Sequence, residues 1–129
     1  MTTPLVSILL NNYNYGRFLK RAIDSALAQT YPYIEVVVTD DGSTDHSREI
    51  IESYGDAIVS VLKPNGGQDS AFNAGFAKSQ GDIICFLDSD DSFVPRKIQT
   101  IVDTFNQNPV AGWCFHALKL LDHKTGKTV

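Results

Sequence analysis

The sequence predicts an α/β fold with a mostly parallel sheet, because short strand-like runs alternate with helix-like runs along the chain. Four runs are apolar on both faces and rich in β-branched residues, which is typical of strands inside a parallel sheet. They cover residues 6–10, 34–39, 57–62 and 82–87. Between them, apolar residues recur at intervals of three and four, as on one face of a helix. This alternation predicts right-handed crossovers with helices on both sides of the sheet.

Each predicted strand is followed by a segment with helical spacing. The first helix should end before Pro32, because the residue before a proline avoids the helical region. The four helices are expected at residues 16–30, after an N-cap at Ser43 or Thr44, at about residues 68–78, and after Pro95. Residues 110–121 are expected to form a fifth strand, followed by a hairpin turn at 122–126.

Length and composition fit one soluble globular domain over residues 1–129, with 43% hydrophobic and 20% charged residues. The net charge of −4 and the scattered basic residues give no footprint for nucleic acid. Cys85 and Cys114 lie in apolar runs, so both are expected to be buried, reduced thiols. The first residues lack the basic start of a signal peptide. A cytoplasmic location is therefore expected, at the membrane face if a longer parent protein carries an anchor.

Polar residues follow the end of every predicted strand. They are residues 11–14, 40–43, 65–67 and 88–91. In open parallel sheets, ligands bind outside the carboxyl ends of the strands. These four sets are therefore expected to converge on one site.

The pattern Asp88-x-Asp90 at the end of the fourth strand is a candidate metal site. Neighbouring carboxylates repel one another unless a cation lies among them, and oxygen ligands suit Mg²⁺ or Mn²⁺. The alternative is a solvated loop whose acids cap the next helix. A calcium loop starting at Asp88 is excluded, because Phe93 stands where glycine is needed and Gln99 where glutamate is needed.

Two other strand ends offer groups for a nucleotide. After the second strand, Asp40 is favoured as an acceptor from a base or ribose, because it leaves the strand first. Turn formation and helix capping explain Asp41 better. The glycines of 65–75 permit close backbone approach of an anion, or simply a tight turn into a closely packed helix. Tyr13 could stack on a base or shield the first helix.

Three blocks taken together resemble the family 2 glycosyltransferases. They read VSILLNNYN, QTYPYIEVVVTDDGSTD and NGGQDSAFNAGFAKSQGDIICFLDSDD, and they cover nearly the whole chain in the family's order and spacing. The resemblance implies the GT-A fold, a Rossmann-like, mostly parallel sheet, here truncated at its C-terminal side without the acceptor-binding half. It also implies inverting, metal-dependent transfer from a nucleotide-sugar, usually a UDP-sugar, to a hydroxyl of a saccharide or lipid-linked acceptor, as in cell-wall or polysaccharide synthesis.

The resemblance further implies roles for single residues. Asn11 and Tyr13 fall where the family contacts uracil, and Asp40 falls where a carboxylate accepts the uracil N3–H. Asp88 and Asp90 match the D-x-D motif that holds Mn²⁺ or Mg²⁺, the first of them near the ribose. The implied donor-binding set is Asn11, Asn12, Tyr13, Asp40, Gly67, Asn73, Asp88 and Ser89.

The chain also departs from the family pattern. Asn11-Asn12 replaces a frequent Pro-Thr pair, and Phe72 replaces a frequent arginine, which puts the diphosphate contact in doubt. The catalytic base, an Asp or Glu in the family, is expected beyond Val129. This leaves a second hypothesis open, a nucleotide-sugar binding module or truncated fragment without transferase activity. Homo-oligomerisation and peripheral membrane association through absent parts also stay open.

A signalling receiver domain is a third hypothesis, because it too has acidic strand ends. It would need an acidic pair after the first strand and a lone aspartate after the third. The chain instead has Asn11-Asn12 and Lys63-Pro64-Asn65 at these positions. The sequence therefore disfavours a receiver domain.

Overall fold

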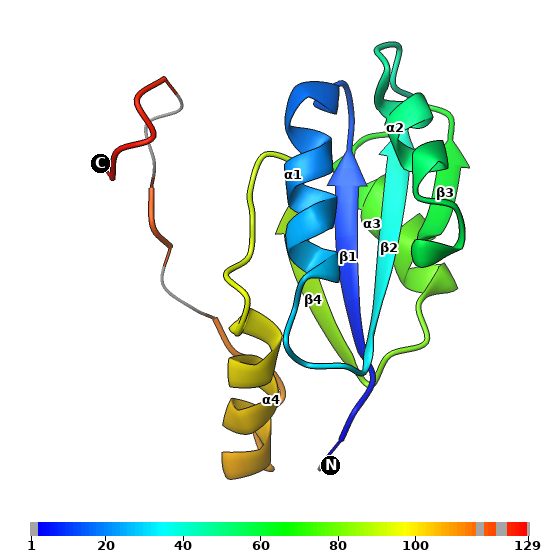
Figure 1. Cartoon of the computed structure of the whole chain (residues 1–129). Coiled ribbons are helices and arrows are strands. Elements are labelled where there is room, and N and C mark those ends of the chain that lie inside the picture. Colours follow the sequence, from blue (N-terminus) through cyan, green and yellow to red (C-terminus); the bar gives the residue numbers. More distant parts are fainter. Residues whose placement is uncertain (1–2, 116–117, 121–123, 129) are drawn as a thin grey trace.

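A computed structural model describes residues 3–115, 118–120 and 124–128. Its centre is a sheet of four parallel strands in the order β3-β2-β1-β4 (Figure 1). The strands are β1 (Val6–Asn12), β2 (Ile34–Asp41), β3 (Val59–Lys63) and β4 (Ile83–Asp88). The predicted α/β class with a parallel sheet is therefore confirmed.

Helices cover both faces of the sheet, as Figure 1 shows. They are α1 (Gly16–Leu27), α2 (Ser47–Ser53), α3 (Gln68–Lys78) and α4 (Lys97–Gln107), with a short 3-10 helix at Gly55–Ala57. In the view of Figure 1, α1 and α2 lie in front of the strands and α3 lies behind them.

The main core lies between the sheet and helices α1, α2 and α4. Alternate residues of β1 enter it (Val6, Ile8 and Leu10), and none of these side chains is exposed to solvent. From the helices, Ile23, Ile51 and Ile98 are among the residues that pack against them. Burial of such side chains supplies most of the free energy that holds the strands in place.

Helix α3 packs on the opposite face of the sheet, mainly against β1 and β2. Gly75 makes this packing close, because a Cβ atom there would lie 2.8 Å from Thr39 Oγ1. Ala71, one turn earlier, is buried. The small residues of this segment therefore bring the N-terminus of α3 close to the ends of the strands.

The order of the strands creates a crevice at the site end of the sheet. The chain adds β2 and then β3 on one side of β1, and then places β4 on the other side. Connections on the two sides of β1 leave in opposite directions, and ligands bind at such switch points. The ends of β1, β2 and β4 therefore define where a site should be sought.

Some element boundaries differ from the prediction. Helix α1 ends at Leu27 rather than at residue 30, and Gln29 turns its side chain to Ser25 O and Val94 O. Helix α2 begins at Ser47, because Asp45 rather than Ser43 accepts the hydrogen bond of a first-turn amide, that of Ser47.

The predicted fifth strand is wrong for the described part of residues 110–121. Residues 110–115 and 118–120 lie in neither a helix nor a strand, and Trp113 and Phe115 are largely exposed. Residues 116–117 and 121 lie outside the described residues, as do 122–123 of the predicted hairpin turn. An apolar run alone predicts burial but not the partner that a strand needs.

Two further findings concern the thiols and the membrane. Cys85 is buried as predicted, and burial raises the pKa of its thiol to about 11. Cys114 is exposed, so the prediction that both thiols are buried is wrong for Cys114. Among the described residues, no helix combines the length and the apolar character required to cross a bilayer.

Candidate nucleotide-binding site

A pocket of about 380 Å³ lies at the carboxyl ends of β1, β2 and β4 and at the N-terminus of α3. It is lined by Asn11, Asn12, Tyr13, Tyr15, Asp41, Asn65, Gly67, Gln68, Ala71, Asp88, Ser89 and Asp90. The four predicted sets of strand-end residues all contribute to this lining. Their convergence, which the sequence predicted, is therefore present in the structure.

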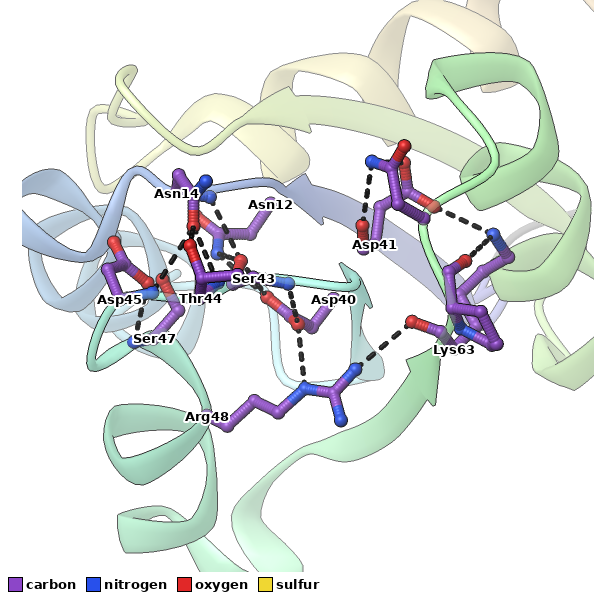
Figure 2. Close-up of polar contacts among 12 residues, drawn as sticks. Asn12, Asn14, Asp40, Asp41, Ser43, Thr44, Asp45, Ser47, Arg48 and Lys63 are labelled. Carbon is purple, nitrogen blue, oxygen red and sulfur yellow. Dashed lines mark hydrogen bonds and ion pairs between the residues drawn. The ribbon is translucent and has the colours of Figure 1, made fainter.

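Asp40 forms the centre of a buried polar network beside the pocket, shown in Figure 2. Its carboxylate is fully buried and accepts four hydrogen bonds: from Asn12 Nδ2 (3.0 Å), Ser43 N (2.9 Å), Ser43 Oγ (2.6 Å) and Arg48 Nε (3.0 Å). Burial alone would raise the pKa of Asp40, but the bonds from Ser43, Asn12 and Arg48 outweigh it and hold the pKa below its usual value. Asp40 is therefore a buried carboxylate whose charge the protein itself satisfies.

Asp41 makes a second network, on the pocket wall. Lys63 Nζ donates to Asp41 Oδ1 at 2.7 Å, and the backbone N–H groups of Gly66 and Gly67 donate at 3.0 and 2.9 Å. Asn65 Nδ2 donates to Asp41 Oδ2 at 3.1 Å. Burial tends to raise the pKa of Asp41, and the bonds from Lys63, Gly66 and Gly67 lower it below the usual value. Asp41 thereby fixes the loop between β3 and α3 against the end of β2.

The loop after β2 approaches the loop before α3 so closely that only glycine fits between them. Gly42 has a φ of +83°, and a Cβ atom on it would lie 2.5 Å from Asn65 N. Asn14, in the left-handed region at φ 56°, accepts hydrogen bonds from Thr44 N and Asp45 N. These contacts lock the loops after β1 and β2 to each other, as Figure 2 shows for Asn14 and its partners.

Three aspartates gather at the end of β4. Carboxylate oxygens of Asp88, Asp90 and Asp91 all lie within 4.8 Å of one another, and all three residues are exposed. Partial burial, together with the charges of Asp90 and Asp88, raises the pKa of Asp91. Oxygen donors at this spacing suit a hard divalent cation such as Mg²⁺ or Mn²⁺, so the donor set fits the predicted metal.

The charge of the pocket is strongly one-sided. Asp41, Asp88 and Asp90 are among its lining residues, whereas no lysine or arginine is. Lys63 neutralises Asp41 from outside the lining, but in the described part of the chain no side-chain donor reaches the carboxylates of Asp88 or Asp90. An anionic ligand would therefore be repelled at this end unless a cation bound with it.

Two asparagines at the end of β1 retain acceptor capacity. The Oδ1 atoms of Asn11 and Asn12 are buried, and no donor reaches them within the described residues. Their amide nitrogens already donate: Asn11 Nδ2 to Gln68 O, and Asn12 Nδ2 to Asp40 Oδ1 and Ser43 Oγ. Buried acceptors of this kind are usually satisfied by water or a ligand.

Most residues of the predicted set line the pocket: Asn11, Asn12, Tyr13, Gly67, Asp88, Ser89 and Asp90. Asp40 and Asn73 are not part of its lining; Asp40 lies in the network beside it, and Asn73 is exposed on α3. Asp41, Tyr15, Asn65 and Gln68 line the pocket although the predicted set omits them.

The alternation of β2 could have identified Asp41 from the sequence. Val36 and Val38 point into the core beneath α1 and α2, and residues two apart share a face, so Asp40 points the same way. Asp41 belongs with Val37 and Thr39, which face α3, and at the end of the strand it reaches the pocket. The face of the strand, rather than the position at which the strand ends, therefore accounts for Asp41 lining the pocket while Asp40 does not.

Comparison with known proteins shows which sequences this chain resembles. The family model described as glycosyl transferase family 2 matches residues 7–125. A protein of Nostoc sp., named as an uncharacterized glycosyltransferase, is 47% identical over 121 residues. That match covers 91% of this chain and 37% of the relative, so the chain spans less than two fifths of the relative's length.

Two solved structures show the same fold. S. aureus TarS 1–349 in complex with UDP-GlcNAc superposes with a TM-score of 0.72 at 26% identity, covering 80% of this chain and 31% of that one. A mannosyltransferase from Pyrobaculum calidifontis, in complex with GDP-Man and Mn²⁺, has a TM-score of 0.65 at 24% identity and covers 77% and 30%. The four-stranded parallel sheet and its flanking helices therefore form a GT-A fold.

Proposed function

The chain belongs to glycosyl transferase family 2, and on this premise we propose that its pocket binds a nucleotide-sugar donor, a UDP-sugar, with a divalent cation. The observation that carries the proposal is the composition of the pocket. Asparagine and tyrosine side chains line one part of it, and a cluster of carboxylates lies at the end of β4. A nucleoside diphosphate with its cation has the same division into a flat polar base and a charged end.

The nucleoside is assigned to the walls formed by β1 and β2. Tyr13 and Tyr15 are 46% and 43% exposed, so their rings can offer a face to a base. Asp41 can accept an N–H from the base, because its carboxylate lies on the pocket wall. Asp40 was the sequence-based choice for this role, but its carboxylate is fully buried and does not line the pocket.

The diphosphate and cation are assigned to the end of β4. Asp88 and Asp90 would hold Mn²⁺ or Mg²⁺, with Asp91 close enough to join them. The bound cation would supply charge neutralisation for the departing nucleoside diphosphate. Phe72, where the family often has arginine, places no positive charge at that position of α3, so the cation would have more charge to offset here. The complex of GDP-Man and Mn²⁺ in the similar mannosyltransferase supports a role for the cation.

The complete reaction is part of the proposal. We infer inverting transfer of the sugar to an acceptor hydroxyl, on a saccharide or lipid-linked acceptor, at the cytoplasmic side of a membrane. A carboxylate base that deprotonates the acceptor is still predicted to lie beyond Val129. The chain alone would then bind the donor without transferring its sugar.

Calorimetric titration tests the donor site directly. UDP is titrated into the chain in the presence of Mn²⁺ and again in EDTA, with GDP as the matched nucleotide. The proposal predicts binding of UDP with Mn²⁺ and much weaker binding in EDTA. Equal affinity for GDP would remove the assignment to uridine, and failure of both nucleotides to bind would contradict the donor site. Binding that is unchanged in EDTA would contradict the role of the cation.

A further inference from the structure

We propose that Arg48, which does not line the pocket, is a positioning residue that holds the nucleoside-binding wall in shape through Asp40 and Lys63. This inference rests on the proposed function. Arg48 Nε donates to Asp40 Oδ2 at 3.0 Å, and its Nη2 donates to the backbone carbonyl of Lys63 at 3.0 Å (Figure 2). One guanidinium from α2 therefore joins the end of β2 to the end of β3.

Each partner of Arg48 holds a residue of the pocket wall. Asp40 accepts from Asn12 Nδ2, and Asn12 is 2% exposed and lines the pocket. Lys63 donates from its Nζ to Asp41 Oδ1, and Asp41 also lines the pocket. Arg48 thus reaches two wall residues, on β1 and on β2, through one intermediate on each side.

The position of β3 explains why such a link is needed. Within the described residues, β3 is an edge strand that pairs only with β2, and its ladder ends at the pair Asp41 and Lys63. Beyond this pair, the chain must turn through Asn65 and Gly66 to reach α3. Arg48 holds the last carbonyl of β3, so the Lys63 side chain starts from a fixed point. A rigid fork with several donors suits this double contact better than a lysine does.

The electrostatics also favour a positioning role. The Asp40 carboxylate is fully buried, whereas the side chain of Arg48 is 40% exposed. A buried carboxylate is costly without a nearby positive charge, and Arg48 is the cation paired with it. Loss of Arg48 would leave Asp40 with its bonds from Asn12 and Ser43 but without that charge. We expect Asn12 and the β3 end to shift while the carboxylates of β4 stay in place.

The test compares two probes on the 129-residue chain: UDP with Mn²⁺, and inorganic pyrophosphate with Mn²⁺. In Arg48→Ala we expect UDP to bind about tenfold more weakly, because a loss of this size corresponds to one charge-assisted hydrogen bond. Pyrophosphate should bind as it does to the wild type. Arg48→Lys, which keeps the charge but not the fork, should recover part of the affinity. Lys20→Ala, which removes the lysine of an exposed ion pair on α1, is the control and should change neither affinity.

A second readout needs no ligand. The amide N–H groups of Gly66 and Gly67 donate to Asp41 and do not touch Arg48. In Arg48→Ala their NMR chemical shifts should move and their hydrogen exchange should accelerate, while those of residues 88–91 stay unchanged. If Arg48→Ala does not fold, Arg48→Gln takes its place, because it removes the charge while keeping most of the side chain, and it should weaken UDP binding selectively as well.

The outcomes separate the two proposals. Wild-type protein that binds UDP, with a folded Arg48→Ala that binds it equally well, would overturn the positioning role and leave the donor site standing. Equal weakening of UDP and pyrophosphate would also overturn it, because the effect would then be general. Wild-type protein that binds neither probe would overturn the donor site and this inference with it.

Discussion

The aspartates at the end of β2 and those at the end of β4 lie at one edge of the same sheet, yet their surroundings are opposite. Asp40 and Asp41 are buried, and each carboxylate accepts four hydrogen bonds from the protein. Asp88, Asp90 and Asp91 are exposed and close enough to repel one another. The protein itself balances the charges of the first pair, whereas the second group leaves its charge for a cation to offset.

The difference shows that a strand-end acid can be structural or functional depending on what surrounds it. Hydrogen bonds hold the pKa values of Asp40 and Asp41 below their usual value despite burial. Partial burial, added to the negative charges of Asp90 and Asp88, raises the pKa of Asp91. A carboxylate that is already satisfied shapes the site, whereas carboxylates that crowd one another favour metal binding.

The largest effect is expected from Asp90→Ala. This substitution removes one of the proposed ligands, so binding of UDP in Mn²⁺ should fall to the level seen in EDTA. The free energy of unfolding should change by no more than about 0.5 kcal/mol, because the side chain is exposed and packs against little. Calorimetry and urea unfolding measure the two quantities. Asp90→Ala that binds UDP and Mn²⁺ like the parent would contradict the metal role.

A mixed effect is expected from Asp41→Ala on the other side of the comparison. It leaves the partly buried Lys63 ammonium without its anionic partner, so the protein should lose both stability and UDP affinity. Binding of Mn²⁺ with pyrophosphate should be retained. Parallel titrations of UDP and pyrophosphate, with thermal unfolding as a check on folding, measure this. Loss of both ligands from a folded variant would show that Asp41 does not act on the nucleoside alone.

A smaller effect on stability is expected from lowering the pH. The pKa values of Asp40 and Asp41 are lower in the folded chain than the usual 3.8. Their contribution to stability is therefore complete above this value and is lost as the pH falls below it towards the lowered pKa values. Urea unfolding between pH 6 and pH 3 should show a steep fall at the acid end. Asp40→Asn should be less stable throughout and less dependent on pH, and an equally steep fall in this variant would contradict the assignment.

The smallest effect is expected from adding a positive charge to the pocket. Gln68 lines it at the start of α3, so Gln68→Lys should increase the residual affinity for UDP in EDTA a few-fold. Gln80→Lys, an exposed change outside the lining, is the matched control. Calorimetry in EDTA and in Mn²⁺ measures both variants. An equal gain from Gln80→Lys would indicate a general effect of net charge instead.

Much of the fold followed from periodicity alone. Strands β1 and β2 and helices α1 and α4 bury a continuous apolar run or stripe, which leaves a clear pattern in the sequence. The pattern also predicted β3 and α3, although β3 is largely exposed and α3 buries only Ala71 and Gly75. The run at residues 110–121 has the same pattern, but its described residues form no strand. A strand needs a partner, and hydrophobicity does not supply the partner's identity. The wrong prediction that Cys114 is buried has the same cause.

The pocket lining was predictable where strand ends carried polar residues. It was less predictable where the direction of a side chain decides whether the residue lines the pocket. Asn12, Gly67 and Asp88 were predicted as site residues, and they line the pocket because the ends of parallel strands converge. Asp41 was missed although the alternation of β2 places it on the pocket face. Arg48 could not have been found in this way. Its two contacts depend on the relative placement of α2, β2 and β3, which no local pattern in the sequence records.

The central claim is that the carboxylates at the end of β4 bind a cation beside a nucleotide seated against β1 and β2. Paramagnetic line broadening by Mn²⁺ in the NMR spectrum, measured with UDP present, tests it most directly. The account predicts that the amides of residues 88–91 broaden first, that Gly67 follows, and that UDP sharpens this selectivity. Broadening centred on any other part of the chain, or independent of UDP, would contradict it.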